Sequence, residues 1–168
     1  MQLNYFAFGS NLSSPRLLQR LPAASLHCVA TLAGHRLRWH KKGRDLSGKC
    51  AIDPTDNHAD RVYGVIYRMT IEERHQLDLI EGHGIGYQRR QVEVLTLAGD
   101  RIEVFTYYAT DIDDARQPYH WYKEHVLRGA LEHGFPIHYV EQIRATASID
   151  DHDPGRHGRE LSIYHEQT

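Results

Sequence analysis

The sequence predicts a single α+β domain, with a small curved mixed β-sheet or barrel flanked by helices. The chain has 168 residues, a length typical of one domain. Hydrophobic residues make up 40% of it, which is enough to bury a core. Apolar runs and alternating segments indicate several strands, while fewer segments show helical periodicity. Strands and helices do not follow one another in the regular βαβα order of a doubly wound fold.

The first third of the chain is predicted to contain several strands and one short helix. Apolar runs or two-residue alternation indicate strands over residues 3–8, 26–32, 35–40 and 50–52. Ser14 as N-cap and Pro15 at the first helical position predict a helix that ends at Pro22. We expect the second and third strands to pair around Ala33-Gly34, and the lysine-rich segment 41–49 to be an exposed loop.

The middle of the chain carries its strongest local signals. Residues 62–69 are apolar on both faces, which predicts a central strand. Thr70 and Glu73 form a capping-box pattern, so a helix should begin there. Gly82 is a natural C-cap and should end that helix, and the glycine-rich residues 82–86 are then a loop.

The last part of the chain is predicted to hold a hairpin, two helices and a polar tail. Residues 88–97 and 101–109 alternate around a Gly-Asp turn, the pattern of a β-hairpin. Helices are expected over residues 118–134 and 137–144. From Thr146 onward Asp, His, Gly and Glu dominate, so we expect a domain over 1–145 and a loosely attached tail over 146–168.

Charge and composition exclude several classes of protein. The chain has 20 Lys and Arg against 22 Asp and Glu, a net charge of -2, which argues against nucleic-acid binding through a basic face. No apolar run approaches the roughly 20 residues that cross a bilayer, and the N-terminal sequence lacks a signal-peptide pattern. We therefore expect a soluble cytoplasmic protein. Cys28 and Cys50 should be small buried residues, and the 13 histidines lack metal-site spacing.

Three segments carry residues suited to chemistry, and each has an ordinary structural alternative. Residues 5–12 form a strand that ends in a Gly-Ser-Asn turn, whose backbone N–H groups would suit an anion or would simply lead into the next helix. Glu81 ends a helix, where the helix dipole and an apolar wall would favour its protonated form; it is otherwise a solvated surface residue. Tyr122 lies in an aromatic cluster at the start of a helix. Its hydroxyl group would contact a ligand, or else the side chain would pack in the core.

These segments resemble, in the same order, the motifs of the γ-glutamylcyclotransferase family. Tyr5-Phe6-Ala7-Phe8-Gly9-Ser10-Asn11-Leu12 resembles the family's YFAYGSNL signature. Residues 77–82 are similar to its LDxxEG segment. Tyr122-Lys123, followed by Gly129-Ala130 and residues 133–136, resembles its YK…GA…xGxP helix. The resemblance covers about residues 5–145, most of the chain.

The resemblance implies a γ-glutamylcyclotransferase-like fold and an enzyme. Family members convert a γ-glutamyl amide into 5-oxoproline and release the amine, because the substrate's own α-amine attacks its γ-carbonyl. One carboxyl group can act as general base and then as general acid, and no metal, nucleotide or flavin cofactor is needed. By position Glu81 would be that catalytic residue. Asp78, one helical turn earlier, is more plausibly a structural partner.

The resemblance also implies the substrate-binding residues. They are Tyr5, Phe6, Ala7, Phe8, Gly9, Ser10, Asn11 and Tyr122. The turn at the end of this motif would hold the α-carboxylate and polarise the γ-carbonyl through backbone N–H groups. The sequence departs from the family at Phe8, where tyrosine is usual, and at His83, where an apolar residue is usual. The basic residues of the neighbouring loop, Lys41, Lys42 and Arg44, are candidates for the wall that selects the amide.

The identity of the amide stays open at this point. It would be a γ-glutamyl amino acid, a γ-glutamyl-lysine-type amine, glutathione or a γ-glutamyl-protected biosynthetic intermediate. The alternative function is a non-catalytic domain that binds a small anion or γ-glutamyl compound on the same fold. The expected partner is thus a small molecule, with no nucleic acid and no membrane, and the resemblance favours a homodimer.

Overall fold

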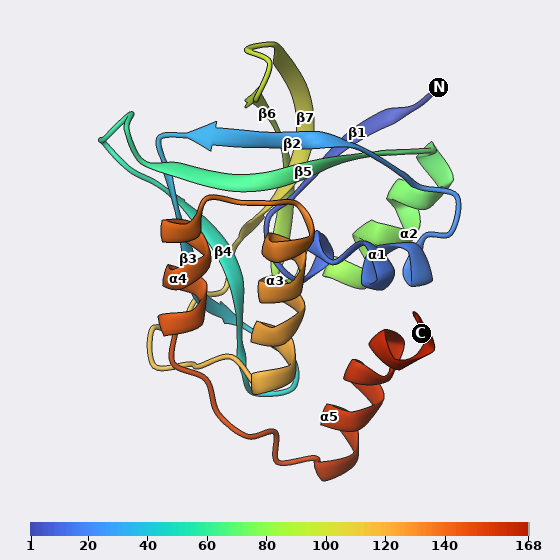
Figure 1. The fold of residues 1–168 in the computed structure, drawn as a ribbon, viewed down its shortest axis with the longest axis vertical. Helices are drawn as coiled ribbons and strands as arrows, with labels where there is room; N and C mark the ends of the chain where they lie inside the picture. Colours follow the sequence, from blue (N-terminus) through green and yellow to red (C-terminus); the bar gives the residue numbers. More distant parts are fainter. Residues whose placement is uncertain (168) are drawn as a thin grey trace.

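A closed β-barrel forms the centre of the molecule in the computed structural model, which describes residues 1–167 (Figure 1). In order around the barrel, the strands are β1 (Leu3–Ala7), β5 (Arg61–Met69), β2 (Ser25–Ala33), β6 (Tyr87–Thr96) and β7 (Arg101–Ala109). Neighbouring strands are antiparallel, except that β1 and β7 close the barrel in parallel at Tyr5 and Phe105. The mixed, curved sheet or barrel that the sequence predicts is confirmed, including the central place of β5 and the β6–β7 hairpin.

A smaller sheet lies beside the barrel. It consists of β3 (His35–Lys42) and β4 (Gly48–Pro54), paired antiparallel. The predicted pairing of β2 with β3 is wrong, because β5 and β6 occupy the two edges of β2. The chain turns away at Gly34, whose φ of 69° favours glycine, and continues into the second sheet. The exposed loop expected over 41–49 is shorter, since Lys41 lies opposite Lys49 in the ladder and is buried.

The helices lie on one side of the barrel, below β2 and β5 in Figure 1, where α3 and α4 lie side by side. Their bounds are α1 (Ser14–Arg20), α2 (Ile71–Glu81), α3 (His120–Glu132), α4 (Ile137–Ala145) and α5 (Pro154–Leu161), with 3-10 turns η1 (Ser10–Leu12) and η2 (Ser162–Gln167). The capping box of α2 is confirmed, because Thr70 and Glu73 each bond the other's backbone N–H. Gly82 ends this helix with a left-handed φ of 71°.

Two predicted helix starts are displaced. The N-cap of α1 is Ser13, because Ser14 already has helical geometry. Helix α3 begins two residues after Pro118, because the carbonyl of Pro118 accepts a hydrogen bond of 3.0 Å from the N–H of Ile149. The predicted second helix of this pair is confirmed as α4.

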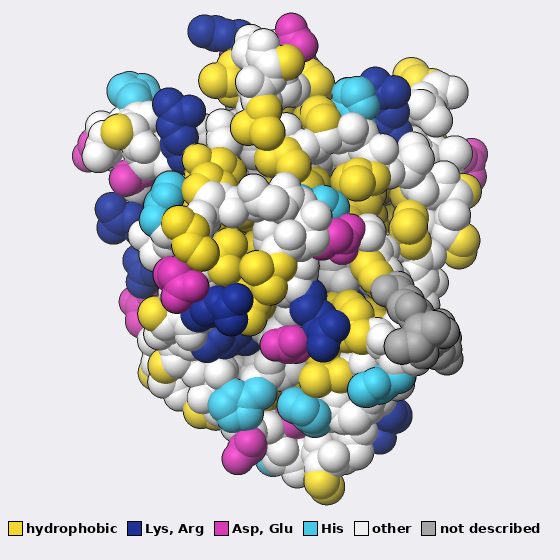
Figure 2. All heavy atoms as spheres, in the orientation of Figure 1, with side chains coloured by type: hydrophobic (Ala, Val, Ile, Leu, Met, Phe, Trp, Pro, Cys, Tyr) yellow, Lys and Arg dark blue, Asp and Glu magenta, His cyan; other side chains and the backbone are white. Residues whose placement is uncertain are grey.

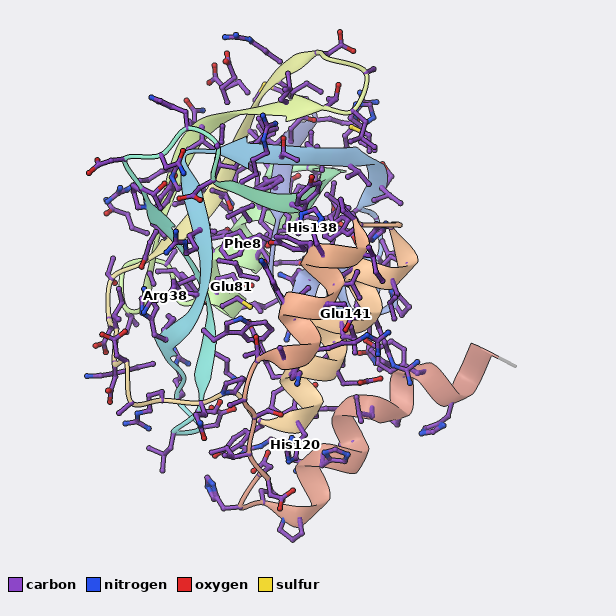
Figure 3. The ribbon with its side chains drawn as sticks, turned by 60° about the vertical axis from the view of Figure 1, so that its left-hand side comes forward. Phe8, Arg38, Glu81, His120, His138 and Glu141 are labelled. Carbon is purple, nitrogen blue, oxygen red and sulfur yellow. The ribbon has the colours of Figure 1, made fainter. Side chains whose placement is uncertain are left out.

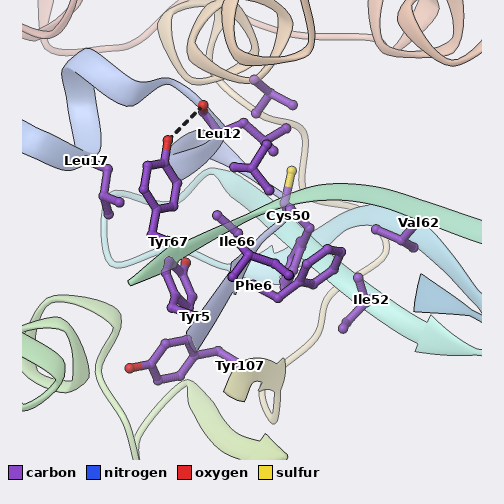
Figure 4. Close-up of a cluster of buried hydrophobic side chains, with 14 of the residues drawn as sticks. Tyr5, Phe6, Leu12, Leu17, Cys50, Ile52, Val62, Ile66, Tyr67 and Tyr107 are labelled. Atoms are coloured by element: carbon purple, nitrogen blue, oxygen red, sulfur yellow. Dashed lines mark hydrogen bonds between the residues drawn. The ribbon is translucent and has the colours of Figure 1, made fainter. Parts of the chain in front are cut away.

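The core joins the first strand to the helices (Figure 4). Phe6 is fully buried inside the barrel, and β5 approaches it closely at Gly64. A Cβ atom at that glycine would lie 2.4 Å from the Phe6 ring, so this packing requires glycine. The hydroxyl of Tyr67 donates a hydrogen bond of 3.3 Å to the carbonyl of Leu12. The turn that follows β1 is therefore tied to the barrel.

The segment after α4 is attached to the body of the protein, so the expected loose attachment is wrong for the described residues. Ile149 forms a parallel bridge with Tyr119. Asp151 accepts a hydrogen bond of 2.8 Å from the indole N–H of Trp121. No residue of helix α5 is fully buried; charged contacts such as Arg16–Glu160 and the packing of Leu161 against the core hold it in place. The polar composition of this segment predicted a free tail, but its polar side chains are the groups that form its contacts with the rest of the protein.

No helix within residues 1–167 is long and apolar enough to cross a membrane. The same part of the chain holds no group of three or more His, Cys, Asp or Glu side chains arranged for a metal ion. The many histidines do not gather into one patch on the face shown in Figure 2, where they are spread between other side chains.

Candidate active site

The three segments singled out in the sequence meet around one small cavity of about 30 Å³. It lies where β1 ends against α2 and α3. Among the described residues its lining consists of Tyr5, Phe8, Gly9, Ser10, Asn11, Cys50, Glu81, Tyr87, Tyr107 and Tyr122. Figure 3 shows Phe8 and Glu81 close together in the interior of the molecule, behind β3 and β4. Residues far apart in the sequence are thus brought together as the motifs predict.

The turn after β1 lines this cavity with Gly9, Ser10 and Asn11. Within residues 1–167, the N–H groups of Gly9, Ser10 and Asn11 make no hydrogen bond. Gly9 is needed for the close approach of its neighbours, because a Cβ atom there would lie 2.9 Å from the Cβ of Cys50 and 3.3 Å from the hydroxyl oxygen of Tyr122. Free N–H groups in a tight turn can bind a carboxylate or a developing oxyanion.

Glu81 faces this turn through Asn11. The amide Nδ2 of Asn11 donates hydrogen bonds to Oε1 of Glu81 at 3.0 Å and to the hydroxyl of Tyr5 at 3.1 Å. Its Oδ1 accepts from Arg20 at 3.3 Å, and because a guanidinium can only donate, this contact fixes which way the amide points. Among the described residues no group donates to Oε2 of Glu81. One carboxylate oxygen is therefore held and the other is free to meet a substrate.

Asp78 is held differently, as its expected structural role requires. Tyr107 donates a hydrogen bond of 2.6 Å to Oδ1 of Asp78, and Arg89 forms an ion pair with Oδ2. Burial alone would raise the pKa of Asp78, but these two partners outweigh burial and lower the pKa below its usual value. Asp78 thus stays ionised and anchors α2 to the β6–β7 hairpin.

Two tyrosines hold the backbone of Cys50 at the back of the cavity. The hydroxyl of Tyr122 accepts a hydrogen bond of 3.0 Å from the N–H of Cys50, and the hydroxyl of Tyr87 donates one of 2.6 Å to its carbonyl. Burial raises the pKa of both phenols well above the ordinary value and that of the Cys50 thiol to about 12. These groups are therefore neutral at physiological pH, and the thiol is no nucleophile.

Some expected binding residues do not line the cavity. Phe6 and Ala7 are fully buried, and neither is part of the lining. The strand alternation explains this for Phe6, because Tyr5 points to the cavity and its neighbour points into the barrel. Cys50, Tyr87 and Tyr107 also line the cavity, although no sequence motif assigns them to a site. The alternating pattern of the strand around Tyr107 could have indicated that this side chain points inward. No pattern in the sequence indicates a role in the site for Cys50.

A groove of about 280 Å³ continues outward from the cavity, and Ser10, Glu81, Tyr87 and Tyr122 line both. Its basic side chains are Arg16, Arg20, Lys41, Arg44, Lys49 and Arg156, and its acidic ones are Asp45, Glu81 and Glu160. Lys41 Nζ lies 4.6 Å from the centroid of the Tyr87 ring. Two of the three expected basic residues, Lys41 and Arg44, thus line this groove, while Lys42 pairs with Asp111 at 3.1 Å. The groove has a basic wall.

A larger groove of about 720 Å³ lies elsewhere, between β3 and α4, with Arg38 and His138 on its walls (Figure 3). None of the site residues predicted from the sequence lines it. Its charged groups are largely engaged with one another, as in the pairs Arg36–Asp60 at 3.4 Å and Arg38–Asp114 at 3.2 Å. The larger groove is therefore not where the residues predicted from the sequence gather, and the small cavity beside Glu81 is the candidate site.

Comparison with known proteins shows which proteins this chain is similar to. The model of the AIG2-like family matches residues 61–143, which include Glu81 and Tyr122. Human gamma-glutamylcyclotransferase is 34% identical over 151 residues, covering 87% of this chain and 79% of the human protein; the mouse protein is 33% identical, covering 84% and 77%. A solved gamma-glutamyl cyclotransferase structure superimposes with a TM-score of 0.81 at 30% identity, covering 89% of this chain and 90% of the other.

Proposed function

The chain belongs to the γ-glutamylcyclotransferase family, and from this premise we propose that it converts a γ-glutamyl amide into 5-oxoproline and a free amine, with Glu81 as general base and then general acid. The observation that carries the proposal is the placement of Glu81 across the cavity from the turn of Gly9 to Asn11, with one carboxylate oxygen held and the other free.

The proposed reaction needs one carboxyl group and no outside nucleophile. The α-nitrogen of the substrate attacks its γ-carbonyl carbon, forming the ring C–N bond, and the original amide C–N bond then breaks. In total the α-ammonium loses two protons and the departing nitrogen gains two. Glu81 can carry one of these protons from the first nitrogen to the second, and the other is lost to and regained from solvent. Because both reacting groups belong to one molecule, holding the γ-glutamyl chain folded supplies much of the acceleration.

The turn after β1 supports the proposal as the place where the γ-glutamyl group is held. Free N–H groups of Gly9, Ser10 and Asn11 suit the α-carboxylate or the oxyanion that forms on the γ-carbonyl. The neutral hydroxyls of the cavity tyrosines add polar contacts without adding charge. Such hydrogen bonds strengthen in a site from which water is excluded.

The basic groove favours substrates whose released amine carries a carboxylate. Lys41 and Arg44 lie on the groove next to Glu81, in the direction in which the amine side of the substrate would leave the cavity. Ion pairing with such a carboxylate would be stronger than in open water, because Lys41 is buried. Among the candidates from the sequence, γ-glutamyl amino acids and peptides therefore fit better than γ-glutamyl derivatives of uncharged amines.

The proposal is tested by incubating the purified protein with a panel of γ-glutamyl compounds and measuring 5-oxoproline. The panel contains γ-glutamyl amino acids, Nε-(γ-glutamyl)lysine, glutathione and an uncharged γ-glutamyl alkylamide. We expect release of 5-oxoproline from at least one member with an anionic amine side. Calorimetric binding of these compounds without release from any of them would instead support a non-catalytic γ-glutamyl-binding domain.

A further inference from the structure

A chain of polar contacts runs from α5 to the turn that lines the candidate active site. Nη1 of Arg16 lies 2.6 Å from Oε2 of Glu160, and Nε of Arg16 donates a hydrogen bond of 3.2 Å to Oγ of Ser10. Ser10 lines both the cavity and the groove. The Arg16 residue is only 7% exposed, so its charge needs a compensating partner. Among the described residues, Glu160 is the carboxylate within ion-pair distance of Arg16.

A second branch of the same network reaches the start of α1. The side chain of His125 is fully buried, and its Nε2 lies 3.1 Å from Nη1 of Arg16. The same nitrogen lies 3.3 Å from Oε2 of Glu160, so His125 contacts both members of the ion pair. Its Nδ1 shares a hydrogen bond of 2.6 Å with the hydroxyl of Tyr164, which in turn shares one of 2.8 Å with Oγ of Ser13.

The C-terminal segment therefore contacts both ends of the short η1 turn, at Ser10 through Arg16 and at Ser13 through Tyr164. No residue of helix α5 is fully buried, and only Leu161 packs against the hydrophobic core, so polar contacts make up most of its attachment among the described residues. Glu160 also lines the groove that leads to Glu81. This segment thus forms part of the groove wall as well as a support for the turn.

We infer that Glu160 and Tyr164 are positioning residues for the candidate active site, holding the Gly9–Asn11 turn in its binding geometry through Arg16, His125 and Ser13. The inference deepens the proposed function and rests on it for its catalytic consequence. The geometric part, that the C-terminal segment fixes the turn, stands independently of any reaction. A turn of three residues with free N–H groups has few internal bonds of its own, so outside contacts decide its order.

The first readout requires no activity. The N–H groups of Leu12 and Ser13 bond the carbonyls of Gly9 and Ser10 within the turn, at 3.0 and 3.3 Å. Amide hydrogen exchange at Leu12 and Ser13 is compared in the full-length wild-type protein and in the Glu160→Gln variant, which keeps the shape of the side chain and removes its charge. We expect exchange at these residues to become about tenfold faster or more in the variant, because a charge-assisted bond that holds the turn is lost. Arg159→Gln is the matched control, since its exposed pair with Asp153 lies on the same helix and does not touch Arg16.

The second readout is steady-state kinetics with the best substrate of the panel. For Glu160→Gln we expect KM to rise about tenfold, because a less ordered turn holds the α-carboxylate of the substrate less tightly, and kcat/KM to fall by at least the same factor. A purely structural role would lower the melting temperature and leave KM unchanged. Arg159→Gln should retain the wild-type KM.

Tyr164→Phe is the second variant, in case Glu160→Gln does not fold. It removes only the hydroxyl that bonds Ser13 and His125, and the same direction of change is expected in both readouts. Wild-type exchange at Leu12 and Ser13 and a wild-type KM in a folded variant would overturn the inference. If the wild-type protein releases no 5-oxoproline from the whole panel, the proposed function fails, and the exchange comparison still decides whether the C-terminal segment positions the turn.

Discussion

Oε1 of Glu81 accepts a hydrogen bond of 3.0 Å from the side-chain amide of Asn11, which lies 70 residues earlier in the chain. The amide is itself oriented by Arg20, so the contact has a defined donor and acceptor. It joins the end of α2 to the turn after β1 across the small cavity. The relationship between these two residues is the basis of the proposed mechanism, because it leaves Oε2 of the carboxylate for the substrate.

The first prediction concerns Glu81. Glu81→Gln keeps a hydrogen-bonding side chain of the same size but cannot exchange a proton at physiological pH. We expect kcat for 5-oxoproline release to fall by at least about 100-fold, the lower range for general acid–base catalysis. Urea unfolding should show a free energy of unfolding close to that of the wild type. A folded Glu81→Gln protein with wild-type turnover would show that another group moves the proton.

Asp78→Asn serves as the matched comparison on the same helix. This change removes the charge that pairs with Arg89 and weakens the bond from Tyr107. We expect the opposite pattern, with a loss of about 1–3 kcal/mol in the free energy of unfolding and a much smaller effect on kcat than Glu81→Gln has. A larger loss of kcat than in the Glu81 variant would reverse the roles assigned to the two carboxylates.

The second prediction concerns the space around Gly9. In Gly9→Ala the new methyl group would lie 2.9 Å from the Cβ of Cys50, closer than real contacts allow, so the backbone must shift. We expect a destabilisation of about 1–3 kcal/mol and a higher KM, because the shift narrows the cavity. Gly158→Ala is the control, since nothing lies within 4 Å of a Cβ atom at that position. Equal stability of the two variants in urea would contradict the close approach at Gly9.

The third prediction concerns the choice of substrate. Lys41→Gln removes a buried cation from the groove next to Glu81. We expect kcat/KM to fall about tenfold for a γ-glutamyl amino acid and less than about threefold for an uncharged γ-glutamyl alkylamide, because only the first can pair with the cation. Arg36→Gln is a control on the other groove. Equal losses for both substrates would mean that Lys41 does not recognise the released amine.

The helix that carries Glu81 could be predicted from the sequence, because the residues that specify it are close together in the chain. Thr70 and Glu73 specify the start of α2, and Gly82 specifies its end, within one turn of sequence at each place. The barrel order was not predictable in the same way. Pairing of β1 with β5 and β7 depends on contacts between distant segments, and the failed β2–β3 pairing shows that the sequence does not reveal which strand edges are already occupied.

The C-terminal segment was misjudged for a related reason. Its polar composition predicts weak burial, and no residue of α5 is fully buried. The partners that attach it, Arg16 on α1 and His125 on α3, are themselves a charged residue and a histidine that a sequence pattern assigns to the surface. Only the folded structure shows that these groups lie next to one another and that their charges and hydrogen-bonding groups are paired.

The fourth prediction is the pH dependence of stability, which follows from this buried histidine. Burial lowers the pKa of His125 to about 4, although its contact with Glu160 opposes the shift. The unfolded chain takes up this proton near the ordinary histidine pKa of 6.5, whereas the folded protein takes it up only near 4. The contribution of His125 to stability is therefore complete above about pH 6.5 and is lost as the pH falls from 6.5 to 4. The difference between the two values corresponds to about 3 kcal/mol.

The pH range from 6.5 to 4.5 isolates this effect from that of Glu160. Burial alone would raise the pKa of Glu160, but its contacts with His125 and Arg16 outweigh burial and lower it to about 2, so its contribution is lost only below about pH 4.5. Urea unfolding of the wild type should show stability that falls with pH across the range. In His125→Asn, which has no proton to gain, the fall should be smaller by about 2 kcal/mol or more at pH 4.5. Parallel stability curves for the two proteins would show that His125 is not held neutral in the folded state.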